Sequence, residues 1–302
     1  MSGFHVSKVV IIESLLDSDW KTGVEIEKVM LHEFAEHGLS VSVERHSIRR
    51  ADEFALIIEL LIRTGNTDPP LLHIETHGDK WDGLIFADGS ELSWTEVGRL
   101  LAPLNEATGF NLVCVFAACY GAFLSRVLYV THASPCFALI GPMDELDPGE
   151  VHRAFRKLYH DFAVTRDMGI ALQRLVQEVP IRGGWFRMRM DRWFLKIMRK
   201  FAEESASAEA MMRNAQSLLR YINSPLKFGL SPDDVGDNFN YHSSGNLTFE
   251  QMQMLVKLKT HHYLSSLAFN RFFMVDSIPS NRDRFSDVEN EIQEKFLPLF
   301  DK

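Results

Sequence analysis

Four short apolar runs, separated by amphipathic segments, constrain the fold of this chain more than any other feature. The runs cover residues 8–15, 71–77, 112–118 and 136–141. Each contains adjacent apolar residues, which is typical of a strand buried on both faces of a parallel sheet. The pattern therefore predicts an α/β fold with a mostly parallel sheet and helices on both faces.

The segments between these runs carry helical spacing and turn signals. Ser93-x-x-Glu96 is a capping box, in which each residue satisfies a backbone group of the other where a helix begins. Asp88-Gly89 lies between apolar flanks and predicts a hairpin turn. Residues 39–44 alternate between apolar and polar side chains, which predicts one further strand. The predicted helices cover residues 22–37, 52–64, 93–104, 121–130, 150–165 and 169–178.

Length and composition are those of a soluble globular protein. The 302 residues suffice for one large domain or for a domain with an appendage. Hydrophobic residues make up 46% of the chain and charged residues 24%, which is enough apolar material for a core. A net charge of −9 argues against a general nucleic-acid binder. No apolar run approaches the ~20 residues that cross a bilayer, so we expect no membrane span.

The three cysteines, Cys114, Cys119 and Cys136, indicate a reducing compartment. An odd and sparse set is not a disulfide framework. Residues 1–5 lack the basic and apolar regions of an export signal, and we expect a cytoplasmic protein. Cys114 and Cys136 lie inside apolar runs and are predicted to be core residues. Cys119 is therefore the thiol that is placed to react.

Two predicted strands end in side chains that can do chemistry. One ends in His77-Gly78, and the other ends in Ala118-Cys119. Because the carboxyl ends of neighbouring parallel strands lie side by side, these side chains can meet across a substrate. A thiol becomes a nucleophile when a base takes its proton, and imidazole titrates near neutral pH. The backbone N–H groups of Gly78 and Cys119 are candidates to hold a developing oxyanion.

This pair of motifs resembles the caspase-like cysteine peptidases, the group that also holds metacaspases, gingipains, separases and bacterial CHAT proteases. Their pattern is an apolar strand ending in His-Gly and a second one ending in a small residue and Cys. The separation of His77 from Cys119 is near the roughly 50 residues given for caspases. Ala117 and Tyr120 depart from the animal caspase signature, which has Gln and usually Arg there, and this favours a prokaryotic relative. The matching segments are Ile74-Glu75-Thr76-His77-Gly78 and Ala117-Ala118-Cys119-Tyr120-Gly121.

The resemblance implies a caspase-like fold over residues 1–180 and a cysteine endopeptidase, a thiol hydrolase in which His77 and Cys119 are catalytic. This chemistry needs no cofactor and no metal, and its substrate would be a protein. A second function stays open, in which the fold is a catalytically silent interaction module that acts through its carboxy-terminal region.

Asp144 and Glu145 follow the predicted strand after that of Cys119. In the resembling families the matching loop helps to form the pocket for the residue before the cut, and an acid there favours Arg or Lys. A solvated acidic loop is the other interpretation, because surface acids are common. Asp79 and Asp82, near His77, are weaker candidates for the same role.

His73, Glu75 and His77 share one face of their strand because they lie two residues apart. Such a trio can bind a metal, but polar groups on a strand face are more often hydrogen-bonded structure. We therefore predict no metal site here. Glu75 is a candidate to orient His77.

Residues 181–302 form a second region, which we predict to be a helical extension that regulates the domain or binds a partner. Residues 185–201 combine aromatic side chains at helical spacing with several basic ones. Such a helix can pack on the domain, lie on an anionic membrane, or bind an acidic partner or nucleic acid. We favour packing, and expect neither a membrane nor a nucleic acid as partner. Further helices are predicted over residues 208–222, 248–273 and 286–296, with a loop over residues 230–246.

Overall fold

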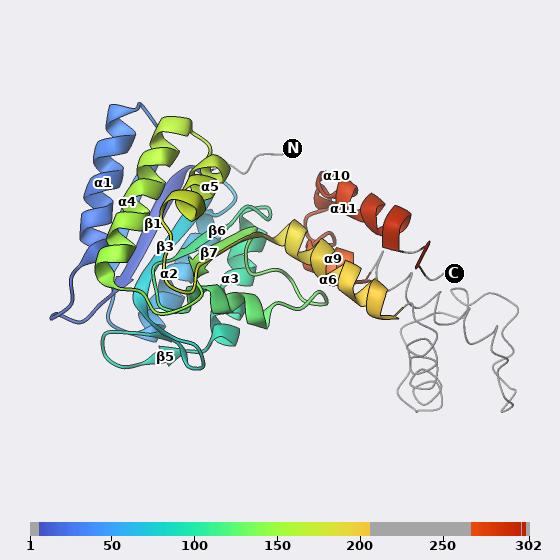
Figure 1. Ribbon diagram of the computed structural model, residues 1–302, viewed down its shortest axis with the longest axis horizontal. Coiled ribbons are helices and arrows are strands. Elements are labelled where there is room, and N and C mark those ends of the chain that lie inside the picture. Colours follow the sequence, from blue (N-terminus) through green and yellow to red (C-terminus); the bar gives the residue numbers. More distant parts are fainter. Residues whose placement is uncertain (1–5, 206–266, 297, 300–302) are drawn as a thin grey trace, which may run out of the picture.

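A mostly parallel β-sheet forms the centre of the chain (Figure 1). The computed structural model describes residues 6–205, 267–296 and 298–299. The strand order across the sheet is β2-β1-β3-β6-β7-β8, and only β8 on this path runs antiparallel to its neighbour. A hairpin of β4 and β5 adds to the end of β3. The strands are β1 (Lys8–Ser14), β2 (Ser42–Ser47), β3 (Pro70–Asp79), β4 (Gly83–Ile85), β5 (Glu91–Leu92), β6 (Val113–Phe116), β7 (Ala138–Pro142) and β8 (Trp185–Arg189).

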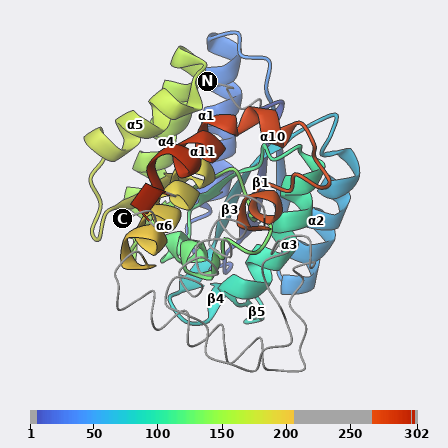
Figure 2. The same ribbon diagram turned by 90° about the vertical axis from the view of Figure 1, so that its right-hand side faces the viewer.

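Helices cover both faces of the sheet (Figure 2). Helix α1 packs against α4, and α4 packs against α5, on one face, whereas α2 packs against α3 on the other. This arrangement confirms the predicted α/β fold. The helices of this part are α1 (Thr22–Glu36), α2 (Ala51–Thr64), α3 (Trp94–Ala107), the 3₁₀ helix η1 (Gly121–Val127), α4 (Pro148–Thr165) and α5 (Met168–Glu178).

Local signals fix where several elements begin and end. Ser93 and Glu96 form the predicted capping box of α3, because the Ser93 hydroxyl accepts from the Glu96 N–H and the Glu96 carboxylate accepts from the Ser93 N–H. Helix α1 ends in a Schellman turn, in which Gly38 has a φ of +59° and the Leu39 N–H donates to the Phe34 carbonyl at 2.8 Å. This turn consumes residues 38–39, so β2 begins at Ser42 rather than at residue 39.

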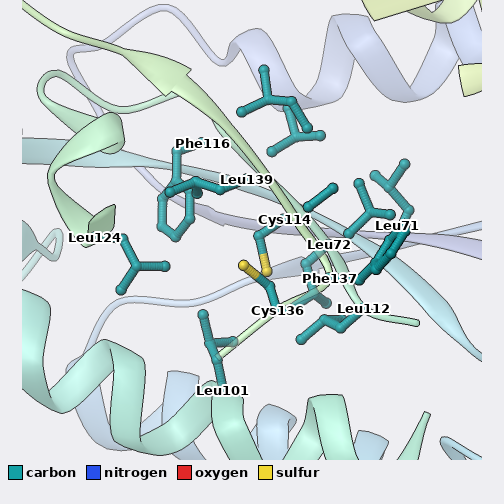
Figure 3. Packing of buried hydrophobic residues seen from close by; sticks show 14 of the residues in the cluster. Leu71, Leu72, Leu101, Leu112, Cys114, Phe116, Leu124, Cys136, Phe137 and Leu139 are labelled. Carbon is teal, nitrogen blue, oxygen red and sulfur yellow. The ribbon is translucent and has the colours of Figure 1, made fainter. Parts of the chain in front are cut away.

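The core between the sheet and α3 holds the two cysteines that do not belong to the candidate site. Cys114 of β6 and Cys136 are fully buried, and their sulfur atoms lie beside each other among Leu72, Leu101 and Leu112 (Figure 3). Burial, followed by the contact with Cys136, raises the pKa of the Cys114 thiol well above its ordinary value. Both thiols are core residues, as predicted.

Residues 185–189 form a strand, which corrects the prediction of one helix over residues 185–201. Phe186 and Met188 alternate with Arg187 and Arg189 at period two, and this segment pairs antiparallel with β7. Helix α6 (Met190–Ser205) follows directly. The aromatic residues that suggested helical spacing are thus divided between two elements. Because β8 completes the sheet, the sheet continues past the boundary that we expected at residue 180.

The described part of the predicted extension packs against the sheet rather than standing apart from it. Phe273 stacks on Phe285 and contacts Phe110 and Phe194 of α6 with ring centroids 4.5, 5.5 and 5.1 Å apart. The aromatic face of α6 therefore packs within this core through Phe194. Besides α6, the helices here are α9 (Ala268–Phe272), α10 (Asn281–Arg284), α11 (Ser286–Glu291) and a π-helical turn, η4 (Ile292–Phe296).

These helices dock at the amino-terminal ends of the central strands. The Arg284 guanidinium donates to the carbonyls of Gly109 and Phe110, just before β6. The expected helix over residues 208–222, the loop over 230–246 and the first part of the helix over 248–273 lie outside the described residues. In the described part of the chain, no helix is long and apolar enough to cross a membrane.

Candidate active site

The carboxyl ends of β3 and β6 bring His77 and Cys119 to the same level of the sheet. The register pairs Ile74 with Phe116, so each candidate residue lies three positions beyond that pair. Contact between the two chain ends is close: a Cβ atom on Gly78 would lie 2.2 Å from the Cys119 carbonyl oxygen. Only glycine fits this gap. The predicted pairing of the two strand ends is therefore present.

A tight turn presents Cys119 at the end of its strand. Tyr120 adopts the left-handed conformation with φ of 58°, which is uncommon for a residue with a side chain and recurs at functional sites. The Gly121 N–H donates to the Ala118 carbonyl at 3.0 Å. A Cβ atom on Gly121 would lie 2.4 Å from that of Phe116, so this position also requires glycine for space. The turn leaves the Cys119 side chain half-buried at the strand end.

Asp19 holds the His77 imidazole. The Nε2 atom of His77 lies 2.8 Å from an Asp19 carboxylate oxygen, and 49% of the His77 side chain is exposed. The same Asp19 oxygen accepts the Leu16 N–H at 2.8 Å. Partial burial acts to raise the pKa of Asp19, but the hydrogen bonds from His77 and Leu16 outweigh it and hold that pKa below its ordinary value. Asp19 is therefore an ionised, fixed acceptor for the ring.

Sequence reasoning missed Asp19 and assigned its role to Glu75. The signal was present, since Asp19 follows β1, whose carboxyl end lies beside that of β3. Ligands and reactive groups gather at this edge of a parallel sheet. Glu75 instead points into the protein with His73, because alternate residues of a strand share a face but not the same depth.

No family model and no curated protein matches this sequence. The reactions that this site could carry out are therefore inferred from its own geometry. Two features favour a nucleophile, namely the strained turn at Tyr120 and the contact of Gly78 with Cys119.

The surroundings of Cys119 favour the protonated form of its thiol. Burial raises its pKa above the ordinary value, and the carboxylates of Glu145 and Asp144 add to the rise, against a lowering contribution from the Leu146 N–H. That N–H lies 3.4 Å from the sulfur. Among the hydrogen bonds of the described residues, none joins Cys119 to His77.

Asp144 and Glu145 lie close enough to the thiol to act on it, but each has another partner. The Asp144 carboxylate pairs with Arg182 at 3.4 Å, and its backbone carbonyl accepts the Tyr120 N–H. The Glu145 carboxylate accepts the Tyr120 hydroxyl at 3.2 Å. The predicted acidic loop thus borders Cys119. Its role in binding a substrate stays a prediction.

The two predicted donors to an oxyanion are the backbone N–H groups of Cys119 and Gly78. The Cys119 N–H acts on the sulfur of its own side chain, which contributes to lowering the thiol pKa, and its role in holding an oxyanion stays a prediction. The Gly78 N–H belongs to the strand end that pairs with β4, and its role there stays a prediction.

The weaker acidic candidate Asp79 shapes the turn after His77. Its carboxylate accepts the backbone N–H groups of Trp81 and Asp82 at 2.6 and 3.1 Å, and these bonds, the first being the stronger, lower its pKa. Asp79 is therefore occupied in holding this loop. Trp81, at its tip, is 72% exposed.

His73 and Glu75 belong to a buried hydrogen-bonded network. His73 contacts the Tyr159 hydroxyl at 2.8 Å and the Glu75 carboxylate at 2.9 Å. The Thr22 hydroxyl donates to the other Glu75 oxygen at 2.6 Å. Both ring nitrogens of His73 are thus engaged within the protein. The structural interpretation of this trio therefore fits better than the metal-binding one.

Proposed function

We propose that this chain is a cysteine endopeptidase of the caspase-like type, acting through His77 and Cys119. The observation that carries the proposal is the fit between the His77-Gly78 strand end and the Cys119 carbonyl, which leaves no room for a side chain at position 78. The ionised Asp19 at the imidazole supports the same assignment.

The proposed mechanism uses the two ring nitrogens of His77 differently. Because the Asp19 carboxylate accepts at Nε2, that nitrogen carries the proton and Nδ1 is left as the base. Nδ1 takes the Cys119 proton as the sulfur attacks the scissile carbonyl. The Cys119 N–H, with that of Gly78, stabilises the oxyanion. The imidazolium then protonates the leaving amine, and water attacks the thioester to release the acid and regenerate the thiol.

The acids beside the thiol favour a basic residue before the cut. Glu145 and Asp144 both act electrostatically on Cys119, so a cationic side chain bound next to the sulfur would meet negative charge. We expect peptides with Arg or Lys at that position to be cut faster than matched peptides with Asp. Faster cleavage of the Asp peptides would contradict this part of the proposal.

The test of the activity compares four variants with the wild-type protein on a library of peptides. Cys119→Ala and His77→Ala should abolish cleavage, while His46→Ala, which alters another partly exposed histidine on β2, should leave it unchanged. Asp19→Asn should slow cleavage by about tenfold or more, because the carboxylate that fixes the imidazole is lost. Cleavage that survives Cys119→Ala would refute the proposal.

The second candidate function is a catalytically silent interaction module. It is favoured by the raised pKa of Cys119 and by the absence, among the described residues, of a hydrogen bond from His77 to the thiol. Alkylation by iodoacetamide separates the two. If losing His77 leaves the Cys119 rate unchanged at every pH, even with peptide present, the silent module is the better description.

The proposals on compartment, source and substrate follow from the sequence. We propose a cytoplasmic, prokaryotic enzyme that acts on a protein substrate without a cofactor in this site. The carboxy-terminal region, whose described part packs at the opposite edge of the sheet from His77, is the candidate surface for a regulatory partner.

A further inference from the structure

A second cluster of reactive side chains lies far from Cys119, on the outer surface where α1 meets α4. Glu33 lies in the last turn of α1, His37 is the residue directly after that helix, and His160 projects from α4. One donor atom from each of the three lies within 4.8 Å of the others. Residues four apart at a helix end share a face, and the His37 Nε2 atom lies 3.7 Å from the Glu33 carboxylate.

The arrangement suits a metal ion in its donor types. Two imidazoles and one carboxylate match the ligand set that zinc takes in sites with three protein ligands, where water fills the fourth position. Zinc with bonds of about 2.0–2.2 Å keeps neighbouring donors roughly 3.3 Å apart in a tetrahedron. The His160 Nδ1 atom lies 2.7 Å and the His37 Nε2 atom 3.7 Å from the same Glu33 oxygen. These separations bracket the required value.

The charge around the cluster is also suitable. Glu33 has no lysine or arginine partner among the described residues, since its ion pairs there are with the two histidines. The nearby Arg166 guanidinium donates to the carbonyls of His37 and Gly38 instead. The Glu33 carboxylate is therefore left to face the imidazoles.

The cluster is both accessible and held in place. The exposed fractions of the side chains are 15% for Glu33, 32% for His37 and 48% for His160, so an ion can enter from solvent. Phe34 and Phe162, beneath the cluster, meet edge to face with centroids 5.9 Å apart. That contact fixes α1 against α4 and keeps the ligands from separating.

We propose that Glu33, His37 and His160 form a binding site for a first-row transition-metal dication, with Zn²⁺ as the expected occupant. The ion would join α1 to α4. This site is independent of the proposed peptidase activity and uses none of its residues.

The test is a titration of the metal-free full chain with Zn²⁺ against a chromophoric chelator. We expect one tight equivalent for the wild-type protein. His37→Ala and His160→Ala should each weaken it by about tenfold or more, because even an indirect partner of a ligand is worth that much. Glu33→Gln, which keeps the shape of the side chain, should weaken it as well.

Two controls make the result specific. His32 and Glu36 are also four residues apart on α1 and lie 3.2 Å from each other, but they form no such cluster with a third metal-ligating side chain among the described residues. His32→Ala should therefore bind Zn²⁺ as the wild type does. Cys119→Ala excludes binding at the half-buried thiol and should also bind normally.

Thermal unfolding gives a second measurement that needs no chelator. Zn²⁺ should raise the Tm of the wild type and of His32→Ala but not that of His37→Ala, provided that far-ultraviolet circular dichroism shows each to be folded. The proposal is overturned if the wild type takes up no tight equivalent, or if the uptake survives His37→Ala and His160→Ala. It is also overturned if the uptake is lost with Cys119→Ala.

Discussion

At the scale of single residues, space and charge around Cys119 decide what the site is able to do. Gly78 is needed for space rather than for an unusual backbone conformation, because its φ lies outside the positive range. Burial raises the pKa of the Cys119 thiol, and the charges of Glu145 and Asp144 add to that rise. The most direct tests of this edge of the sheet are therefore to add one carbon atom at position 78 and to remove one charge at position 145.

Gly78→Ala should destabilise the protein by about 1–3 kcal/mol, because the added carbon would overlap the Cys119 carbonyl and force one chain segment to move. Urea unfolding measures this free energy. The matched control is Gly98→Ala in the middle of α3, where the new carbon would meet neighbours at 3.5 Å. That change should stabilise the protein by up to about 1 kcal/mol. Equal effects of the two substitutions would show that the contact at Gly78 is not tight.

Glu145→Gln should shift the pH at which Cys119 reacts with iodoacetamide to a lower value. A carboxylate near a thiol disfavours the thiolate and raises the thiol pKa, so its removal lowers that pKa. The rate should therefore increase at every pH below the wild-type thiol pKa, and the two profiles should converge at higher pH. Glu44→Gln, on β2, is the control and should leave the profile in place. A shift to higher pH would contradict the assigned electrostatics.

At the scale of elements, the sequence predicted those whose signals are local. The capping box fixed the start of α3 and Asp88-Gly89 fixed the hairpin, since both depend on residues within one turn. The prediction from the sequence was wrong at β8, because the alternation over residues 185–189 is short and the aromatic side chains continue into α6 at helical spacing. Pairing with β7 decides that segment. Asp19 was missed for the same reason, since its role depends on a strand 58 positions away.

Ser93→Ala should cost about 0.5–2 kcal/mol of unfolding free energy, because the Glu96 N–H loses its acceptor and the Glu96 carboxylate loses the hydroxyl. Thermal or urea unfolding would detect the loss. The control is Thr95→Ala, which changes an exposed residue two positions further into α3. It is expected to be neutral or slightly stabilising because alanine favours helices. A neutral Ser93→Ala would indicate that water replaces the cap.

At the scale of the whole molecule, the described carboxy-terminal helices and the sheet share one hydrophobic core. Phe273 is fully buried between Phe110, before β6, and Phe285, before α11. Strand β8 joins the sheet directly to α6. These described segments should therefore unfold together with the sheet rather than as a separate unit.

Phe273→Ala should reduce the free energy of unfolding by about 3–5 kcal/mol, the usual cost of a cavity of this size. Because the core is shared, far-ultraviolet circular dichroism and tryptophan fluorescence should give the same urea midpoint, and both should fall together. Tyr129→Ala, which removes an aromatic ring that is 61% exposed, should change the midpoint little. Two separate transitions in the wild type would show that the carboxy-terminal helices are independent.

The gap at Gly78 also links how two distant segments can evolve. A side chain gained at position 78 would need the Cys119 turn to retreat, and that retreat would in turn separate the thiol from the imidazole. Descendants of this chain that have abandoned the chemistry are free to accept such a change, whereas those that retain it are not. Among natural variants, the residue at position 78 should therefore distinguish the lineages that have lost the site before any change appears at Cys119 itself.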